Sequence, residues 1–311
     1  MLRFTLLRIL QFPLILGIIY LVTFALIWVV PGDPFQKGAD RTIDPLALEE
    51  LKRQFRADSW QSFLGYYPLQ ILTRLDFGPS LFYKGWSVNE VLAASLPVSV
   101  TLGLFALTLA LIVGVAVGAL AAVRRGGPLD VLSLTVALVG VSVPSFVVAG
   151  VLLLLFSVVW RVFPVGGWGS WRDLILPGVA LSLLPMAYIA RLTRVAMIDT
   201  LSADYVRTAR AKGLARGAVV WRHALRNALL PVLSYLGPAA AVTLTGSFVV
   251  EKVFNIPGLG QHFVNSVLNR DQTLILGVVM VYSVMLLAFN LLVDIGYAFV
   301  DPRVDVTARG E

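Results

Sequence analysis

The densest group of charged side chains lies between Arg191 and Arg226, where eight of the chain's 25 Lys and Arg residues occur. Guanidinium and ammonium groups bind carboxylates, phosphates and anionic lipid headgroups. Long apolar stretches flank this basic segment on both sides. Because basic segments beside a membrane normally face the cytoplasm, the pattern favours a cytoplasmic surface that binds a protein partner or lipid.

Residues suited to catalysis are scarce. The sequence has no GxxxxGK[ST] phosphate-binding loop, so we expect no ATP hydrolysis on this chain. Its two histidines, His223 and His262, belong to no HExxH or comparable metal-ligand motif, and it contains no cysteine. We therefore expect no catalytic residue, no metal and no cofactor on this chain.

The composition indicates an integral membrane protein. Of 311 residues, 58% are hydrophobic and only 14% are charged, which lies far outside the range of soluble domains. The net charge of +7 comes without any nucleic-acid-binding motif, so we expect no nucleic-acid partner.

Six uncharged apolar runs are long enough to cross a bilayer, because roughly 20 helical residues at ~1.5 Å each span a core of ~30 Å. Backbone groups find no water in lipid, so such spans must be helical. We expect an all-α membrane protein with residues 1–311 forming one transmembrane domain. The runs are Ile9–Val30, Leu96–Val123, Val131–Trp160, Leu174–Ala190, Pro231–Val250 and Gln272–Val293.

The Lys and Arg residues predict the orientation. Counted on alternate sides of the six runs, 14 fall on the side of the N-terminus and 11 on the other, of which seven lie in the long connection 31–95. Long translocated loops carry little weight in the positive-inside rule, and discounting this one leaves 14 against four. We expect both termini in the cytoplasm and 31–95 as an extracytoplasmic loop region, with a short helix after Asp44 as a lid.

Asp294 lies at the end of the last apolar run, where the C-terminus of a helix disfavours negative charge. We expect it to pair with a basic side chain from a neighbouring cytoplasmic end, such as Arg191 or Arg194. The alternative is a hydrated carboxylate at the membrane interface.

Several segments together resemble the permease subunits of binding-protein-dependent ABC importers, and in particular the first permease subunit of the oligopeptide, dipeptide and nickel group. In the basic segment, Gly213 and Leu230-Pro231 fit the signature of that family, whereas Arg207-Thr208-Ala209 replaces its Glu-Ala-Ala. The segments are DYVRTARAKGLARGAVVWRHALRNALLP (204–231), VVEKVFNIPGLGQ (249–261), NLLVDIGYAFVDPRV (290–304) and VVPGDP (29–34).

The resemblance implies a type I importer permease fold in which residues 199–230 form a cytoplasmic ATPase-coupling loop. Gly213 would divide the loop into a helix over 199–212 and a coupling helix that begins near Leu214 or Ala215. His223 and Asn227 lie four residues apart and would fasten the loop to the bundle. From charge alone, a solvated loop in contact with lipid remains the alternative. The implied coupling residues are Arg207, Ala209, Ala211, Gly213, Leu214, Ala215, Arg216, Arg222, His223 and Asn227.

The resemblance also implies partners and a location. These are a second homologous permease subunit, two ATPase subunits that hold ATP and Mg, an extracytoplasmic substrate-binding protein, and the lipid of a prokaryotic inner membrane. Peptides are the expected cargo, with nickel or glutathione as alternatives. A self-contained channel or secondary carrier is the alternative from a different class, and it would work without an ATPase.

Polar residues within the apolar runs are candidates for lining a translocation pathway, although hydrogen bonds that support helix packing explain most residues of this kind. Gly114 and Gly118 form a GxxxG pair, which we interpret as a packing face. The pathway candidates are Ser142, Ser145, Ser182, Tyr188, Thr243, Thr245 and Ser247.

Overall fold

The computed structural model describes residues 2–29, 60–83 and 85–300, and the lid expected after Asp44 lies outside these ranges. Regular structure in the described residues is helical, apart from one bridge between Pro79 and Ser87. The helices are α1 (Leu2–Val29), α3 (Trp60–Arg74), α4 (Val88–Val123), α5 (Pro128–Ser142), α6 (Ser145–Leu152), η1 (Leu153–Val159), α7 (Trp171–Ser202), α8 (Asp204–Ala211), α9 (Arg216–Ala218), η2 (Val219–Ala224), α10 (Leu225–Val253), α11 (Leu259–Asn269) and α12 (Gln272–Val300), where η marks a π-helical turn.

Five helices in the described part of the chain are long and apolar enough to cross a membrane, and α5 with α6–η1 makes a sixth span if the bent pair counts as one. The expected all-helical fold with six spans is confirmed at this level. The expected span over Val131–Trp160 is divided into two helical pieces, because the helix axis turns by 104° between Ser142 and Ser145.

Pro144 explains the break. A proline has no N–H to donate to the preceding turn, and it drives the residue before it out of the helical region. Val143 is accordingly extended, with φ −96° and ψ 123°, and Pro144 is the N-cap residue of α6. The sequence therefore divides this apolar run into two helical pieces of similar length.

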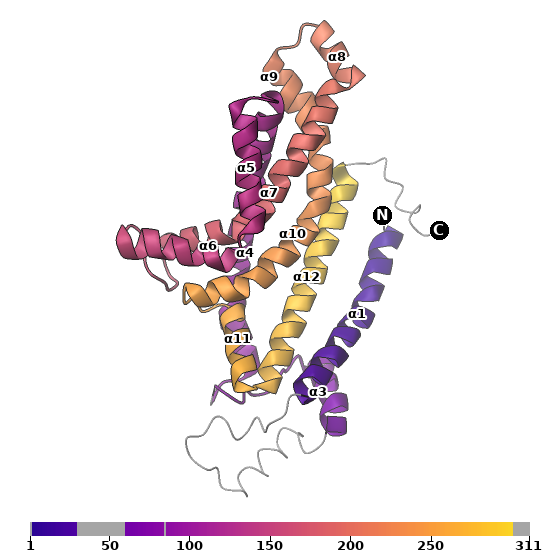
Figure 1. Ribbon diagram of the computed structural model, residues 1–311. Helices are drawn as coiled ribbons and strands as arrows, with labels where there is room; N and C mark the ends of the chain where they lie inside the picture. The colour runs from indigo at the N-terminus through magenta and orange to yellow at the C-terminus, as the bar shows by residue number, and fades with distance from the viewer. Residues whose placement is uncertain (1, 30–59, 84, 301–311) are drawn as a thin grey trace, which may run out of the picture. The chain divides into compact units, whose positions relative to one another are not determined.

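The chain forms two compact units. The first unit contains residues 1–8, 100–256 and 288–311, and the second contains 9–99 and 257–287. In the first unit α7 packs along α5 and α10, with α8 and α9 at the end of this group (Figure 1).

Within the first unit, α4 and α7 approach closely where two glycines lie on the contact face of α4. A Cβ on Gly114 would lie 2.9 Å from Met186 O, and a Cβ on Gly118 would overlap Ala190 O. Both positions thus require glycine if the two helices are to keep this separation. The interpretation of the GxxxG pair as a packing face is confirmed.

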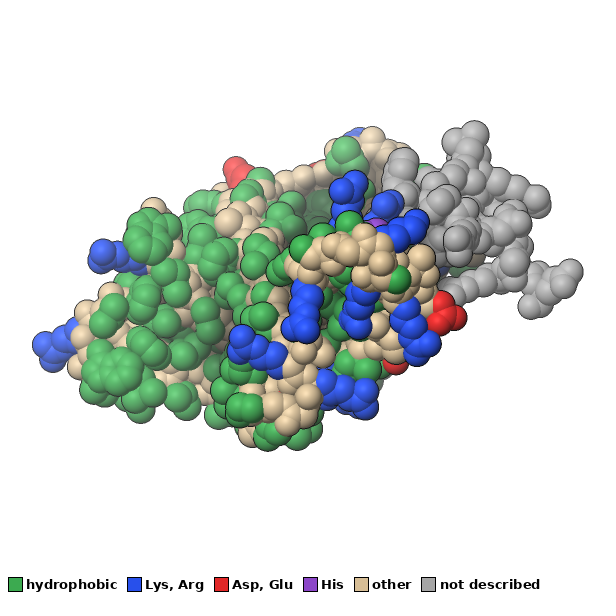
Figure 2. Space-filling model, turned by 90° about the horizontal axis from the view of Figure 1, so that it is seen from above, with side chains coloured by type: hydrophobic (Ala, Val, Ile, Leu, Met, Phe, Trp, Pro, Cys, Tyr) green, Lys and Arg blue, Asp and Glu red, His purple; other side chains and the backbone are tan. Residues whose placement is uncertain are grey.

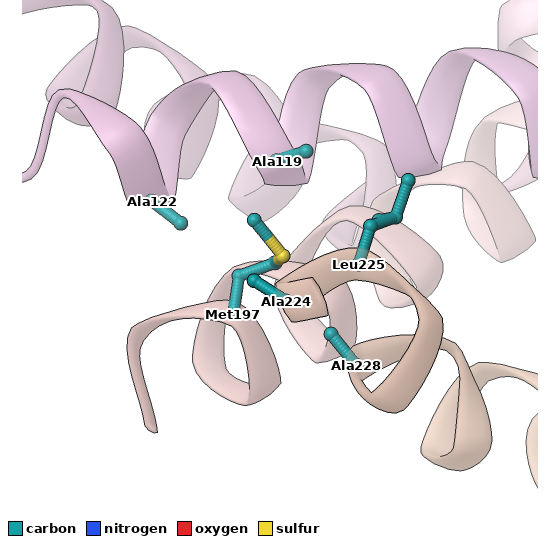
Figure 3. Packing of buried hydrophobic residues seen from close by; sticks show 6 residues of the cluster. All are labelled: Ala119, Ala122, Met197, Ala224, Leu225 and Ala228. Carbon is teal, nitrogen blue, oxygen red and sulfur yellow. The ribbon is translucent and has the colours of Figure 1, made fainter. Parts of the chain in front are cut away.

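A cluster of small buried residues fixes the end of α7 (Figure 3). The fully buried side chain of Met197 on α7 lies among alanines of α4 and residues at the start of α10. This packing holds the last part of α7 beside α4 and the start of α10, and therefore positions the segment between α7 and α10. The cluster consists of Ala119, Ala122, Met197, Ala224, Leu225 and Ala228.

The second unit has its own core of aromatic side chains. Tyr20 and Phe24 of α1 pack with Phe63 and Tyr67 of α3 and with Leu276 of α12. The Tyr67 hydroxyl donates a hydrogen bond of 3.0 Å to a backbone carbonyl at the start of α12. Burial of large aromatic rings stabilises such contacts and the bond satisfies the hydroxyl.

The buried carboxylate of Asp271 organises the loop that precedes α4 in the second unit. It accepts hydrogen bonds from the Ser80 hydroxyl, from Phe82 N at 3.1 Å and from Leu274 N at 3.1 Å. The last of these caps the N-terminus of α12, where negative charge is favoured. One side chain thus ties the loop to the helix.

Candidate functional site

The basic segment folds as a short helix between two long ones. The expected helix over 199–212 is wrong as one element, because Ala203 adopts an extended conformation with φ −69° and ψ 149° and ends α7 at Ser202. The chain then starts again as α8, which contains Arg207, Ala209 and Ala211. The break gives α8 a direction independent of α7.

Gly213 ends α8 in a left-handed turn, with φ +78°. Its N–H donates to Arg210 O at 3.0 Å, and Leu214 N–H donates to Ala209 O at 3.4 Å. These two bonds satisfy carbonyl groups at the end of α8 in the pattern of a Schellman motif. The predicted role of Gly213 as the divider of two helices is confirmed.

The helix after Gly213 differs from the expected short coupling helix. It begins where predicted, with Ala215 as the N-cap and Arg216 as the first helical residue. However, α9, η2 and α10 continue as one helix, since residues 216–244 form a single membrane-spanning candidate. The short separate helix is therefore α8, on the other side of Gly213.

Apolar packing and one hydrogen-bonded pair hold α8 in place. Val206 and Ala209 face inward and pack on Val219. Asn227 Nδ2 donates to the Tyr205 hydroxyl at 2.8 Å, which links α10 to α8. The side chain of Asn227 thus makes a contact of the kind predicted, which holds the loop to the bundle. His223 takes part through its backbone carbonyl, which accepts a hydrogen bond from the Tyr205 hydroxyl at 3.5 Å.

The outward face of this segment, which we call the basic loop surface, combines cations with large apolar groups (Figure 2). Among the apolar groups, Trp221 is 61% exposed. Arg207 forms a solvent-exposed pair with Asp204, at 3.4 Å. Arginine and aromatic residues together are typical of protein interfaces. The surface comprises Tyr205, Arg207, Arg210, Lys212, Leu214, Arg216, Trp221, Arg222 and Arg226, all of them exposed.

The pathway candidates do not form one group. The hydroxyls of Ser182, Thr243 and Ser247 are buried and donate to carbonyl groups of their own helices. This arrangement is typical of helix packing. The side chain of Thr245 is not among those that the structure describes.

The remaining candidates are less buried. Ser142 is exposed and donates to Leu138 O, and Ser145 lies across the helix break from it at the start of α6. Tyr188 is 38% exposed, with its ring 5.5 Å from that of Tyr235.

Asp294 has a basic partner, as predicted, but not the expected one. Its carboxylate pairs with Arg8 at 3.3 Å. Arg194 instead pairs with Asp130, whose importance the sequence reasoning missed. The 64 residues that separate Asp130 from Arg194 leave no local signal for this pair.

The second unit also contains a polar cluster that was not predicted from the sequence. His262 Nδ1 lies 3.1 Å from the Tyr83 hydroxyl, to which Asn265 Nδ2 donates at 3.3 Å. Burial lowers the pKa of His262. Because the described residues contain no cluster of three acidic or histidine side chains, they offer no metal site there.

These features define a class of protein. Several described helices are long and apolar enough to cross a membrane, and a structured basic surface connects two of them. Such an architecture is typical of a membrane transport protein. Comparison with known proteins identifies the family.

The chain belongs to the family of binding-protein-dependent transport system inner membrane components, which matches residues 114–306. It is 41% identical to the dipeptide transport system permease protein DppB of Bacillus subtilis, over 94% of each chain. It is 42% identical to the oligopeptide transport system permease protein OppB of Escherichia coli K12, over 98% of this chain and 99% of the relative. The chain is thus a multi-pass permease subunit of an ABC importer and not an enzyme, which confirms the resemblance inferred from its motifs.

Proposed function

We propose that this chain forms half of the pathway by which an ABC importer carries peptides across a prokaryotic inner membrane. The observation that carries the proposal is the similarity, at 40–42% identity over nearly the full chain, to permeases named for dipeptide and oligopeptide transport. Nickel and glutathione remain alternatives as cargo.

The complete importer needs partners. Six spans are few for a closed two-sided pathway, so a second homologous permease subunit supplies the other half. With no phosphate-binding loop in the sequence, ATP and Mg bind to two ATPase subunits instead. An extracytoplasmic binding protein delivers the substrate.

The basic loop surface contacts the ATPase subunits. The rigid attachment of α8 through Val206, Ala209 and the Asn227–Tyr205 bond supports this role, because a fixed helix passes on a displacement that a loose loop would absorb. The excess of basic residues supports a cytoplasmic position for this surface and for both termini.

The break between α5 and α6 lines the pathway. Fifteen residues of α5 at ~1.5 Å each reach ~22 Å, so the break falls inside a core of ~30 Å. Among described residues, no backbone hydrogen bond joins the first N–H groups of α6 to the last carbonyls of α5. Backbone N–H and C=O groups without hydrogen-bond partners are energetically costly in lipid. This cost supports contact of the break with water in the pathway.

Cysteine labelling tests this position for the break. The chain has no native cysteine, so Ser145→Cys is directly usable. In the assembled importer, it reacts with a membrane-impermeant thiol reagent, whereas Val136→Cys, on the exposed apolar face of α5, does not. Equal reactivity of the two cysteines, or none at Ser145→Cys, contradicts the assignment.

Reconstitution tests the function as a whole. The chain is placed in lipid vesicles with its permease, ATPase and binding-protein partners, and uptake of labelled dipeptides, longer peptides, nickel and glutathione is measured. We expect peptide uptake that requires both ATP and the binding protein. Uptake of nickel or glutathione alone would overturn the cargo, and uptake without the ATPase would overturn the importer mechanism.

A further inference from the structure

A buried ion pair joins α5 to α7 within the first unit. The carboxylate of Asp130, in the first turn of α5, accepts hydrogen bonds from Arg194 Nη2 at 2.8 Å and from Arg194 Nε at 2.5 Å. It also accepts a bond of 2.9 Å from Gly126 N, in the turn between α4 and α5. The carboxylate therefore ties that turn and the start of α5 to one arginine on α7.

The geometry of this pair is specific. The Asp130 side chain is 5% exposed and that of Arg194 is 19% exposed, so water screens their attraction little. Two parallel bonds between a guanidinium and a carboxylate fix relative orientation as well as distance. By contrast, Arg207 and Asp204 lie in the same helix, α8, so their exposed pair ties no two helices together.

Farther along α5, a contact with α7 at Gly140 is less directional. A Cβ on Gly140, near the far end of α5, would meet Ala187 and Leu183 of α7 only at ordinary van der Waals distance. Small apolar contacts of this kind resist sliding weakly. Among the described residues, the ion pair is thus a directional contact that holds α5 in position along α7.

The pair also lies close to the basic loop surface along the chain. Arg194 is on the last turns of α7, which ends at Ser202 immediately before α8. Met197, one turn beyond Arg194, packs α7 against α4 and α10. A displacement of α8 therefore acts first on a segment of α7 that carries the ion pair.

We propose that Asp130 and Arg194 are positioning residues for transport, which hold α5 to α7 so that movement of the basic loop surface reaches α5 and the helix break that follows it. The proposal rests on the proposed function of that surface. It assigns to the pair a role in energy coupling, with no contact to peptide or ATP.

Substitutions separate coupling from folding. Asp130→Asn and Arg194→Gln each remove one charge, and Arg191→Gln removes an exposed charge from the same helix as a matched control. In reconstituted importer we expect the first two to keep ATPase binding and basal hydrolysis within about twofold, while peptide moved per ATP falls about tenfold. The control should match the parent protein.

The result that overturns the proposal is an unchanged ratio of peptide moved to ATP hydrolysed, or a fall that only follows loss of assembled complex. If the parent protein takes up no peptide, the proposed cargo fails instead. The two failures are therefore distinguishable.

A second measurement needs no substitution in the pair. Spin labels are placed on Leu129→Cys and Val195→Cys, two exposed positions adjacent to the pair in a chain without other cysteines. In the assembled importer, their separation should be the same in the resting state and in the ATP-trapped state. A changed separation on trapping means that the pair opens during the cycle, and the proposal is then wrong.

Discussion

Replacing Gly213 by alanine should loosen the turn that orients α8. Gly213 has φ +78°, and a Cβ built on it meets nothing within 4 Å. The substitution is therefore not opposed by a steric clash with another part of the described chain. Its cost comes from the left-handed backbone conformation alone.

The magnitude follows from that conformation. A left-handed backbone costs a residue with a side chain roughly 1–2 kcal/mol, so the population of the native turn falls about 5- to 30-fold against competing conformations. Asparagine tolerates this region better than alanine does. Gly213→Ala should therefore destabilise the turn more than Gly213→Asn does.

Gly217, four residues further along the chain, provides a matched control. It lies in α9, has no positive φ, and a Cβ there would also meet nothing within 4 Å. Alanine is favoured over glycine inside a helix by about 0.8–1.0 kcal/mol. Gly217→Ala should therefore leave α8 unchanged or stabilise the helix that follows it.

The assay is a titration of the reconstituted permease pair with its ATPase subunits, together with peptide uptake. Gly213→Ala should weaken ATPase binding by at most the factor by which the population of the native turn falls, which is about 5- to 30-fold. Gly217→Ala should leave ATPase binding unchanged. Equal binding and uptake for Gly213→Ala and the parent protein would refute the reasoning. So would an equal defect in both variants.

Three further outcomes are expected. Gly118→Val should lower thermal stability in detergent by about 1–3 kcal/mol, since its side chain overlaps Ala190 O on α7, and an unchanged unfolding midpoint would contradict the close approach. Asn227→Ala and Tyr205→Phe should each weaken ATPase binding by about 0.5–1.5 kcal/mol through loss of their shared bond, whereas additive effects in the double variant would show that the two act separately. Because burial lowers the pKa of His262, the unfolded chain binds more protons below about pH 6.5, so stability should fall as the pH drops through that value, and His262→Gln should remove part of this dependence in a thermal scan.

The membrane spans and the Gly213 turn were predictable because their signals are local. An apolar run long enough to cross lipid has few alternatives to a helix, and a glycine between two helical patterns is a common place for a left-handed turn. The sequence also placed the start of the following helix correctly, at Ala215.

The features that sequence patterns could not determine depend on tertiary structure. Pro144 breaks its helix by 104°, whereas Pro231 and Pro238 remain inside α10, so the presence of proline alone does not determine the outcome. The partner of Asp294 had to be chosen among several basic residues near helix ends. Packing of the first unit selects Arg8 for Asp294 and Arg194 for Asp130, and no sequence spacing contains that information.

The composition of the basic loop surface implies a division of labour between its two kinds of side chain. Exposed charges mainly accelerate association and are screened by salt, whereas buried aromatic and apolar groups provide most of the affinity. Arg210→Gln should therefore slow ATPase association at low salt and have little effect at high salt. Trp221→Ala should raise the dissociation rate at both salt concentrations. The same salt dependence in both variants would mean that the cations contribute to affinity within the interface. The proposed separation of roles between charged and apolar side chains would then be wrong.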